Sequence, residues 1–259
     1  MSRVKINGGR MIGYDEAGSG DATPFVFLHG VGSDKSVWHP QLEYFGKTRR
    51  ALAFDYPGYG DSDPASEGTS RDDYAEAILA AMHALDLARA HICGLSLGGV
   101  VAIALYTLDP RACASLILAD SFAVHPNGRA IYERGIAGSD DLPAMAEARV
   151  NLLLAQPADP AVRREVVETM SRIDPAAYRI GAGAVWLADQ RDRARSIHAP
   201  TLVICGEQDT ITPPPLSNEL AALVSDARME VIADAGHLTN LEKPNEFNAL
   251  AEEFIRALP

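Results

Sequence analysis

A serine flanked by glycines constrains the fold of this chain more than any other feature. Residues 94–99 read Gly-Leu-Ser-Leu-Gly-Gly, between a short apolar run at 91–93 and a longer apolar segment at 100–105. This order predicts a strand, a sharp turn and a helix, with Ser96 strained at the turn and its hydroxyl exposed above a sheet. The flanking glycines let the strand and the helix pass close together, where a side chain would clash. The segment therefore predicts a nucleophilic serine on an α/β scaffold.

Composition limits the partners of the protein. The chain has 259 residues, 47% of them hydrophobic, and a formal net charge of -12. This length suits one large α/β domain or two small ones. The acidic balance argues against nucleic acid or an anionic membrane as a partner, because both require basic patches. No apolar run approaches the roughly 20 residues of a membrane-spanning helix. Nucleic acid and membranes are therefore not expected as partners, and the oligomeric state stays open.

Cysteine usage and the N-terminus bear on the compartment. The first residues lack the apolar core of a signal peptide. Cys93, Cys113 and Cys205 are odd in number, so we expect free, buried thiols and a cytoplasmic location. The chain has no Cys-x-x-Cys or His-rich spacing, so no metal is expected, and the chemistry of a nucleophilic serine requires no cofactor.

Short apolar runs alternate with helical patterns along the chain. Strands are predicted at residues 10–14, 25–28, 50–54, 91–93, 115–119, 201–205 and 229–232. Apolar residues at helical spacing predict helices over 72–87 and 245–258. The later strands are apolar without alternation, as in parallel strands covered on both faces. The pattern predicts a mostly parallel, doubly wound α/β sheet.

Residues 122–195 interrupt this alternation, because they contain no convincing strand. We expect this segment to be a helical cap inserted into a core formed by residues 1–121 and 196–259. Ligands of open α/β sheets bind at the carboxyl ends of the strands, so a cap there forms the roof of a pocket. Trp186, in the cap, is a candidate substrate-binding residue.

Helical pieces are predicted within the cap at residues 142–154 and 161–170. Asp174 and Pro175 predict the N-cap and first turn of a further helix. The cap contains ten arginines, no lysine and ten acidic residues. The cap is therefore near neutral, and we expect its arginines to form a solvated surface. A single inward-pointing arginine stays possible.

A serine nucleophile requires a base and an acid that orients the base. His237 follows Ala235-Gly236 in a small-residue loop after the last predicted strand, which is where the base belongs. Asp209 follows the strand at 201–205 and is the preferred acid. Asp120, at the end of the strand 115–119, is its rival, whereas Asp234 is expected to be a turn residue. The chain order Ser96, Asp209, His237 agrees with a hydrolase on an α/β sheet.

The tetrahedral oxyanion of acyl transfer requires two backbone N–H donors. Leu97, directly after the serine, supplies one at a helix N-terminus, where the helix dipole favours negative charge. Val31 supplies the other, in the loop after the strand 25–28. His29 and Gly30 precede Val31 and are candidate substrate-binding residues. Donors of this kind each contribute about 10² to 10³ in rate.

The chain resembles the α/β-hydrolase superfamily over nearly its full length. The resemblance rests on the Gly-x-Ser-x-Gly turn, on His-Gly-Val-Gly-Ser-Asp at 29–34 with Trp38 following, and on Asp-Tyr-Pro-Gly-Tyr-Gly-Asp-Ser at 55–62. A narrower resemblance is to 3-oxoadipate enol-lactonases and related serine esterases. It rests on residues 29–34, 206–214 and 235–244.

This resemblance implies a serine hydrolase that cleaves an ester or lactone of a small organic acid through an acyl-enzyme. It implies Ser96 as nucleophile, Asp209 as acid, His237 as base, and Val31 and Leu97 as oxyanion donors. Haloalkane dehalogenases and epoxide hydrolases of this fold use an aspartate nucleophile, so the serine favours carbonyl chemistry.

Three alternative functions stay open. Hydrolysis of a C–C bond in ring-cleavage diketones ranks second, since residues 30–33 depart from the Gly-Gly-x-Pro-Gly style of loop common in such enzymes. Amide or lactam hydrolysis is possible with the same residues. A ligand-binding receptor on this fold is the alternative that is not an enzyme, although the complete set of candidate catalytic residues favours an enzyme.

Overall fold

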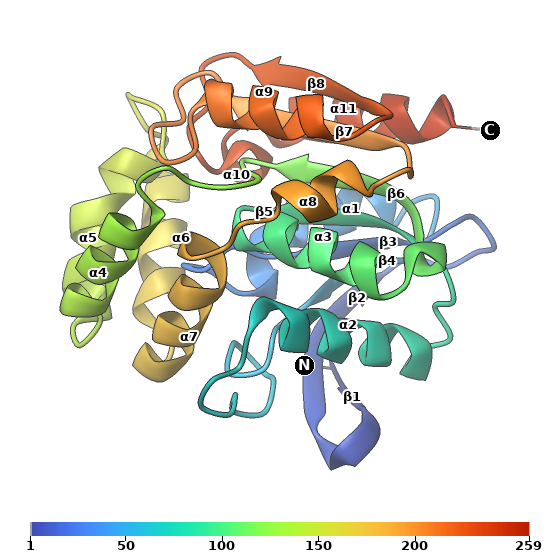
Figure 1. Cartoon of the computed structure of the whole chain (residues 1–259), viewed down its shortest axis with the longest axis horizontal. Coiled ribbons are helices and arrows are strands. Elements are labelled where there is room, and N and C mark those ends of the chain that lie inside the picture. Colours follow the sequence, from blue (N-terminus) through green and yellow to red (C-terminus); the bar gives the residue numbers. More distant parts are fainter. Residues whose placement is uncertain (1, 259) are drawn as a thin grey trace.

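An eight-stranded sheet forms the centre of the molecule (Figure 1). The computed structural model describes residues 2–258. The strands are β1 (Ser2–Lys5), β2 (Met11–Ala17), β3 (Phe25–Leu28), β4 (Ala51–Phe54), β5 (Ala90–Leu95), β6 (Cys113–Ala119), β7 (Thr201–Gly206) and β8 (Ala227–Ile232). They lie in the order β1-β2-β4-β3-β5-β6-β7-β8. Strands β3 to β8 run parallel, and β2 runs antiparallel to both of its neighbours. The predicted mostly parallel α/β sheet is confirmed.

All seven predicted strands are present, and β3 coincides with its predicted range. Strand β1 was not predicted. Three of its four residues are exposed and Val4 is only half-buried, so no apolar pattern marks it. It forms at the edge of the sheet because its backbone pairs with β2.

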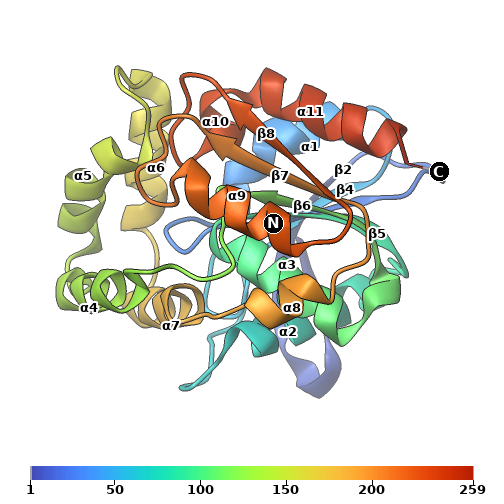
Figure 2. The ribbon, with the colours of Figure 1, turned by 45° about the horizontal axis from the view of Figure 1, so that its top comes forward.

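Helices cover both faces of the sheet (Figure 2). The helices of the core are α1 (His39–Phe45), α2 (Arg71–Ala84), α3 (Leu97–Leu108), α9 (Pro214–Leu223), α10 (Thr239–Glu242) and α11 (Pro244–Arg256), with short 3-10 helices at Asn7–Gly9, Lys35–Trp38 and Pro110–Ala112. Helices α1, α10 and α11 lie on one face, and α2, α3 and α9 lie on the other. The predicted helix over 72–87 ends earlier, because the chain turns at Asp86 with φ 59°.

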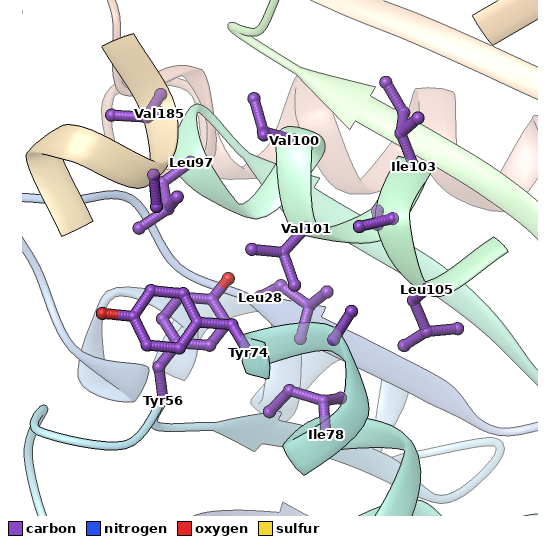
Figure 3. Close-up of a cluster of buried hydrophobic side chains, with 14 of the residues drawn as sticks. Leu28, Tyr56, Tyr74, Ile78, Leu97, Val100, Val101, Ile103, Leu105 and Val185 are labelled. Carbon is purple, nitrogen blue, oxygen red and sulfur yellow. The ribbon is translucent and has the colours of Figure 1, made fainter. Parts of the chain in front are cut away.

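Alternate residues of β3 build the two layers of the core. Phe25 and Phe27 face α1 and α11, whereas Val26 and Leu28 face α2 and α3. On the second face, α3 is apolar almost throughout and packs over Leu28 and the tyrosine rings of Tyr56 and Tyr74 (Figure 3). The three cysteines are free and buried, as predicted.

The chain between β6 and β7 forms helices α4 (Gly128–Gly138), α5 (Leu142–Leu153), α6 (Pro160–Ser171), α7 (Pro175–Trp186) and α8 (Arg191–Arg195). Helices α4 to α7 gather at one side of the molecule, and α8 packs against α3 and α9 (Figure 1). Asp174 caps α7 by accepting hydrogen bonds from the N–H groups of Ala176 and Ala177. This confirms the predicted N-cap and first-turn proline.

The two ends of this helical segment lie side by side. Val124 and Asp189 form an isolated antiparallel bridge, and the N–H of Gln190 donates to the carbonyl of Ala123 at 2.7 Å. The division of the chain into a core and a cap at residues 122–195 stays a prediction. Within residues 2–258, no helix is both long enough and apolar enough to cross a bilayer.

Candidate active site

Ser96 stands at the turn between β5 and α3 with φ 55° and ψ -111°. Non-glycine residues rarely adopt this positive φ, so the turn is strained and its surroundings must hold it. The N–H of Ser96 donates to the carbonyl of Ala119 in β6, and its own carbonyl accepts from the hydroxyl of Ser121, each at 2.9 Å. The predicted strand, turn and helix are confirmed, and the neighbouring strand holds the turn in place.

Two glycines are required by close contacts around this turn. A Cβ atom on Gly94 would lie 2.2 Å from the carbonyl oxygen of Gly98. A Cβ atom on Gly98 would lie 2.0 Å from the carbonyl oxygen of Leu28, at the end of β3. Both distances are far below van der Waals contact, so the backbones approach this closely only because side chains are absent.

The structure brings Ser96, His237 and Asp209 together from three distant parts of the chain. The Ser96 Oγ lies 3.1 Å from Nε2 of His237, and Nδ1 of His237 lies 2.8 Å from Oδ2 of Asp209. All three side chains are almost fully buried. With Nδ1 protonated, the imidazole donates to the carboxylate and Nε2 is free to accept the serine proton.

The contact with Asp209 changes the acidity of both groups. Burial alone would lower the pKa of His237, but the charge and hydrogen bond of Asp209 raise it above the ordinary 6.5. Burial would raise the pKa of Asp209, but the charge and hydrogen bond of His237, together with hydrogen bonds from Thr212, lower it. An ionised carboxylate therefore stabilises the protonated imidazole.

Thr212 holds the carboxylate of Asp209 in place, a role that was not predicted. Its N–H and hydroxyl donate to Asp209 at 2.9 and 2.7 Å, and the N–H of Ile211 donates at 2.7 Å. The signal in the sequence is Asp-x-x-Thr, since aspartate commonly accepts hydrogen bonds from backbone N–H groups two and three residues on.

The rival acid Asp120 has other partners. It is fully buried and accepts from the N–H of Gly206 at 3.0 Å, and from the N–H and hydroxyl of Thr239 at 3.2 and 2.6 Å. Burial, with the nearby charge of Asp209, raises the pKa of Asp120. It therefore links β6 to the strand and loop that carry Asp209 and His237. Asp234 is exposed at a turn, with φ 51°.

The loop that carries His237 is tied to the end of α5. The N–H of His237 donates to the carbonyl of Leu153 at 2.7 Å. The carboxylate of Glu242 accepts from the N–H of Gly236 at 2.9 Å and from the N–H of Ala155 at 2.7 Å. One carboxylate therefore joins the histidine loop to the segment after α5, and this link was not predicted.

The candidate oxyanion donors have free N–H groups. Among the hydrogen bonds of residues 2–258, neither the N–H of Val31 nor that of Leu97 has a protein acceptor. The loop before Val31 lies directly beside the serine, because a Cβ atom on Gly30 would be 3.5 Å from the Cβ of Ser96. Two unused donors next to a nucleophile are suited to holding a developing oxyanion.

A buried ion pair fixes the segment that follows this loop. The ammonium of Lys35 lies 2.8 Å from Asp55 and 2.6 Å from Asp61, and the N–H of Lys35 donates to Asp55 at 2.9 Å. A Cβ atom on Gly60, where φ is 47°, would lie 2.2 Å from the Asp55 carboxylate. The Asp-x-x-Gly-x-Gly-x-Ser turn therefore wraps around a carboxylate that also binds the segment after Val31.

A cavity opens over the serine. Its wall includes Ser96, His237, Gly30, Val31 and Trp186, with further apolar side chains from α6 and from the loops of the core. Of the three candidate substrate-binding residues, the structure places Gly30 and Trp186 in this wall. It does not place His29 there: the imidazole is fully buried beside the rings of Tyr56 and Tyr59, and burial lowers its pKa.

Arg149 of α5 and Tyr178 of α7 also line the cavity, and neither was predicted. The arginine count of the cap gave no signal of which side chain points inward. Helical spacing places Arg149 three residues after Ala146 and one before Val150, both buried, and this marks it as bordering the inner face of α5.

Comparisons with known proteins show which family and fold the chain shares. A model of the alpha/beta hydrolase family matches residues 25–250. The dihydrolipoyllysine-residue acetyltransferase component of an acetoin cleaving system from Pseudomonas putida is 32% identical, over 96% of this chain and 68% of that protein. The 3-oxoadipate enol-lactonase 1 of Acinetobacter baylyi is 26% identical, over 96% of this chain and 95% of that protein.

One solved structure similar to this chain is that of an enol-lactonase from Burkholderia xenovorans LB400. The TM-score is 0.91, and the identity is 26% over 98% of this chain and 100% of that one. The predicted resemblance to enol-lactonases is therefore confirmed, and the relatives support a hydrolase activity. On the strength of the family match and the shared fold, this chain belongs to the alpha/beta hydrolase family.

Proposed function

We propose that the protein is a serine hydrolase that cleaves an ester or lactone of a small organic acid through an acyl-enzyme. The observation that carries the proposal is the line of hydrogen bonds from Ser96 through His237 to Asp209, with distances of 3.1 and 2.8 Å, in the wall of a cavity. The similarity to enol-lactonases supports an ester or lactone bond over other carbonyl compounds.

In the first half of the reaction, Nε2 of His237 accepts the hydroxyl proton of Ser96 as Oγ bonds to the substrate carbonyl carbon. The carbonyl electron pair moves to oxygen, and the N–H groups of Val31 and Leu97 donate to this oxyanion. When the intermediate collapses, the C–O bond to the leaving group breaks and His237 protonates the leaving oxygen. In a lactone that oxygen stays attached to the acyl chain.

In the second half, water replaces the leaving group. His237 accepts a proton from the water as its oxygen attacks the acyl carbon, and then returns a proton to Ser96 Oγ as the acid is released. Asp209 keeps the imidazole in the tautomer with Nδ1 protonated and stabilises its charged form. Each proton that His237 accepts is passed on within the same half-reaction, so the enzyme ends unchanged.

The test is turnover of p-nitrophenyl acetate and butyrate by the wild type and by Ser96→Ala, together with labelling by an alkyl phosphonate. We expect labelling at Ser96 and a loss of ~10⁴-fold or more in the variant, with thermal stability near that of the wild type. Retention of more than about a tenth of the activity would contradict the proposal. A receptor would bind ligands without labelling at Ser96.

A further inference from the structure

One charged side chain in the cavity wall has no carboxylate partner. Arg149 lies in α5, is half-buried, and lines the same cavity as Ser96 and His237. It also lines a second hollow, open to solvent between α4, α5 and the segment 210–216. Arg149 therefore contributes to the walls of both the cavity at the serine and the solvent-open groove.

The other arginines of the segment 122–195 differ from Arg149. Six of them lie within 4.0 Å of a carboxylate: Arg163, Arg172, Arg179, Arg191, Arg193 and Arg195. Arg129, Arg134 and Arg164 are exposed, so water satisfies them. Within residues 2–258, Arg149 has no carboxylate within 4.0 Å, and it is the only one of the four unpaired arginines that lines the cavity at Ser96. A half-buried cation without an anion is unfavourable in the free protein and favours an anionic ligand.

A single hydrogen bond orients the guanidinium. Its Nη1 donates to the hydroxyl of Tyr178 at 2.7 Å, and this tyrosine is fully buried in α7. A guanidinium has five N–H donors in a planar fork, so most of them stay available for a carboxylate. The tyrosine fixes the position of the fork without neutralising its charge.

The remaining charges around the cavity agree with this placement. Arg149 is close enough to His237 for its charge to lower the pKa of the imidazole, although the opposite effect of Asp209 is larger. Glu165 of α6 also lines this cavity; it is exposed to solvent, and partial burial of its carboxyl raises its pKa. An anionic group is therefore attracted to the wall formed by α5 and is repelled by Glu165.

We propose, on the basis of the function proposed above, that Arg149 binds a carboxylate of the substrate. The substrate class is then an ester or lactone that carries a second, free carboxylate group. The scissile carbonyl lies at Ser96, and the free carboxylate accepts hydrogen bonds from the guanidinium. Arg149 acts as a specificity-determining residue, because it selects the anionic substrate and takes no part in the proton transfers.

A purely structural role is the competing explanation, since the hydrogen bond to Tyr178 also connects α5 to α7. A structural brace would affect all esters equally. Charge recognition would affect only those substrates that carry the carboxylate. The two explanations therefore differ in the ratio of specificity constants between substrates of the same shape and different charge.

The experiment uses ester pairs matched in shape. Monoethyl succinate, glutarate and adipate carry a free carboxylate, and ethyl succinamate, glutaramate and adipamate replace it with a neutral amide. Butyryl glycolate and butyryl glycolamide place the same two groups on the alcohol side. The released acid is titrated at constant pH, and kcat/KM is measured for each pair in the wild type, Arg149→Met, Arg149→Lys and the exposed control Arg164→Met.

We expect the wild type to prefer the carboxylate member of at least one pair. Arg149→Met should lower the ratio of kcat/KM, carboxylate over amide, about 10- to 100-fold in that pair, the range of a hydrogen bond to a charged group. Arg149→Lys should retain more of the preference, and Arg164→Met all of it. A wild type without preference in any pair, or an equal loss on both members in Arg149→Met, would overturn the inference. If the amide esters are still hydrolysed in a Ser96-dependent manner, the proposed function survives that failure.

Discussion

At the scale of single residues, the two buried aspartates near His237 have opposite properties. Asp209 contacts the imidazole and its pKa is lowered, whereas Asp120 accepts three hydrogen bonds from Gly206 and Thr239 and its pKa is raised. From the sequence, Asp209 was the preferred acid because it follows β7, and Asp120 remained the alternative. The contact with the imidazole distinguishes Asp209 from Asp120 as the candidate acid, and this contact cannot be derived from the order of the residues alone.

Exchanging each aspartate for asparagine tests this difference. Asp209→Asn should lower kcat about 10⁴-fold, because the imidazole loses the partner that fixes its tautomer. Asp120→Asn should destabilise the fold by about 1 to 3 kcal/mol, because the amide NH₂ faces donors, and it should lower kcat far less. Ester turnover and denaturant unfolding of the two variants provide the comparison. The reverse order of activities would place the acid at Asp120.

The raised pKa of His237 predicts a pH dependence of activity. The imidazole must be neutral to accept the serine proton, so kcat/KM for a neutral ester should fall on acidification with a midpoint above 6.5. The contact between Asp209 and His237 also stabilises the fold, and this contribution has the opposite pH dependence to the activity. It is fully present below the unfolded value near 6.5 and is lost as the pH rises through the folded value. A midpoint of the pH–rate profile below 6.5 would contradict the raised pKa of His237.

At the scale of elements, the close approach of α3 to β3 depends on one missing side chain. Gly98→Ala would place a Cβ 2.0 Å from the carbonyl of Leu28, so we expect a loss of about 3 kcal/mol or more in the free energy of unfolding. Gly183 of α7 is the matched control, since its Cβ would meet Tyr132 at an ordinary 3.6 Å. Gly183→Ala should stabilise the protein by up to about 1 kcal/mol, the helix propensity difference. Equal effects in denaturant unfolding would refute the packing explanation.

Glu242 is a second test at this scale, because it joins the loop of His237 to the segment after α5. In Glu242→Gln the amide NH₂ faces the N–H of either Ala155 or Gly236, so one of these donors loses its acceptor. We expect a loss of about 1 to 3 kcal/mol in stability and a lower kcat, because the histidine loop is held less firmly. Glu246→Gln, at an exposed position of α11, should change neither by a comparable amount. Unchanged kcat in Glu242→Gln would mean that the loop is held by other contacts.

The elements themselves were largely predictable from the sequence. Strands β3 to β7 are mostly apolar runs between turn residues, and the serine turn identified the central strand and its helix. The exception is β1, which is formed by backbone pairing with β2 and not by burial of apolar side chains. Helices α4 and α8 were not assigned individually, because α4 mixes glycine, arginine and apolar residues and α8 has only five residues, of which Ala194 alone is apolar.

At the scale of the whole molecule, the sequence predicted which residues follow which strands but not which side chains meet in the cavity. Ser96, Asp209 and His237 follow the parallel strands β5, β7 and β8, so topology alone brings them to one edge of the sheet. Arg149 and Glu242 depend on how helices and loops pack onto that edge. Their roles follow from contacts between segments distant in sequence, which periodicity does not encode.

The distribution of charge leads to a prediction for the whole molecule. The net charge is -12, and residues 122–195 are balanced, with ten arginines against ten acidic residues, so the excess of acid lies on the rest of the chain. An anionic substrate is then repelled at long range by the molecule and attracted at short range by half-buried Arg149. Salt screens the long-range repulsion between exposed charges more strongly than the contact with Arg149, since the Debye length falls from about 30 Å to about 10 Å between roughly 0.01 and 0.1 M salt. We therefore expect kcat/KM for monoethyl glutarate to rise over this range, and kcat/KM for ethyl glutaramate to stay constant. A fall in kcat/KM for the anionic ester would show that the route to Ser96 is electropositive despite the net charge. A parallel change in kcat/KM for both esters would show that salt acts on the fold and not on the encounter with the substrate.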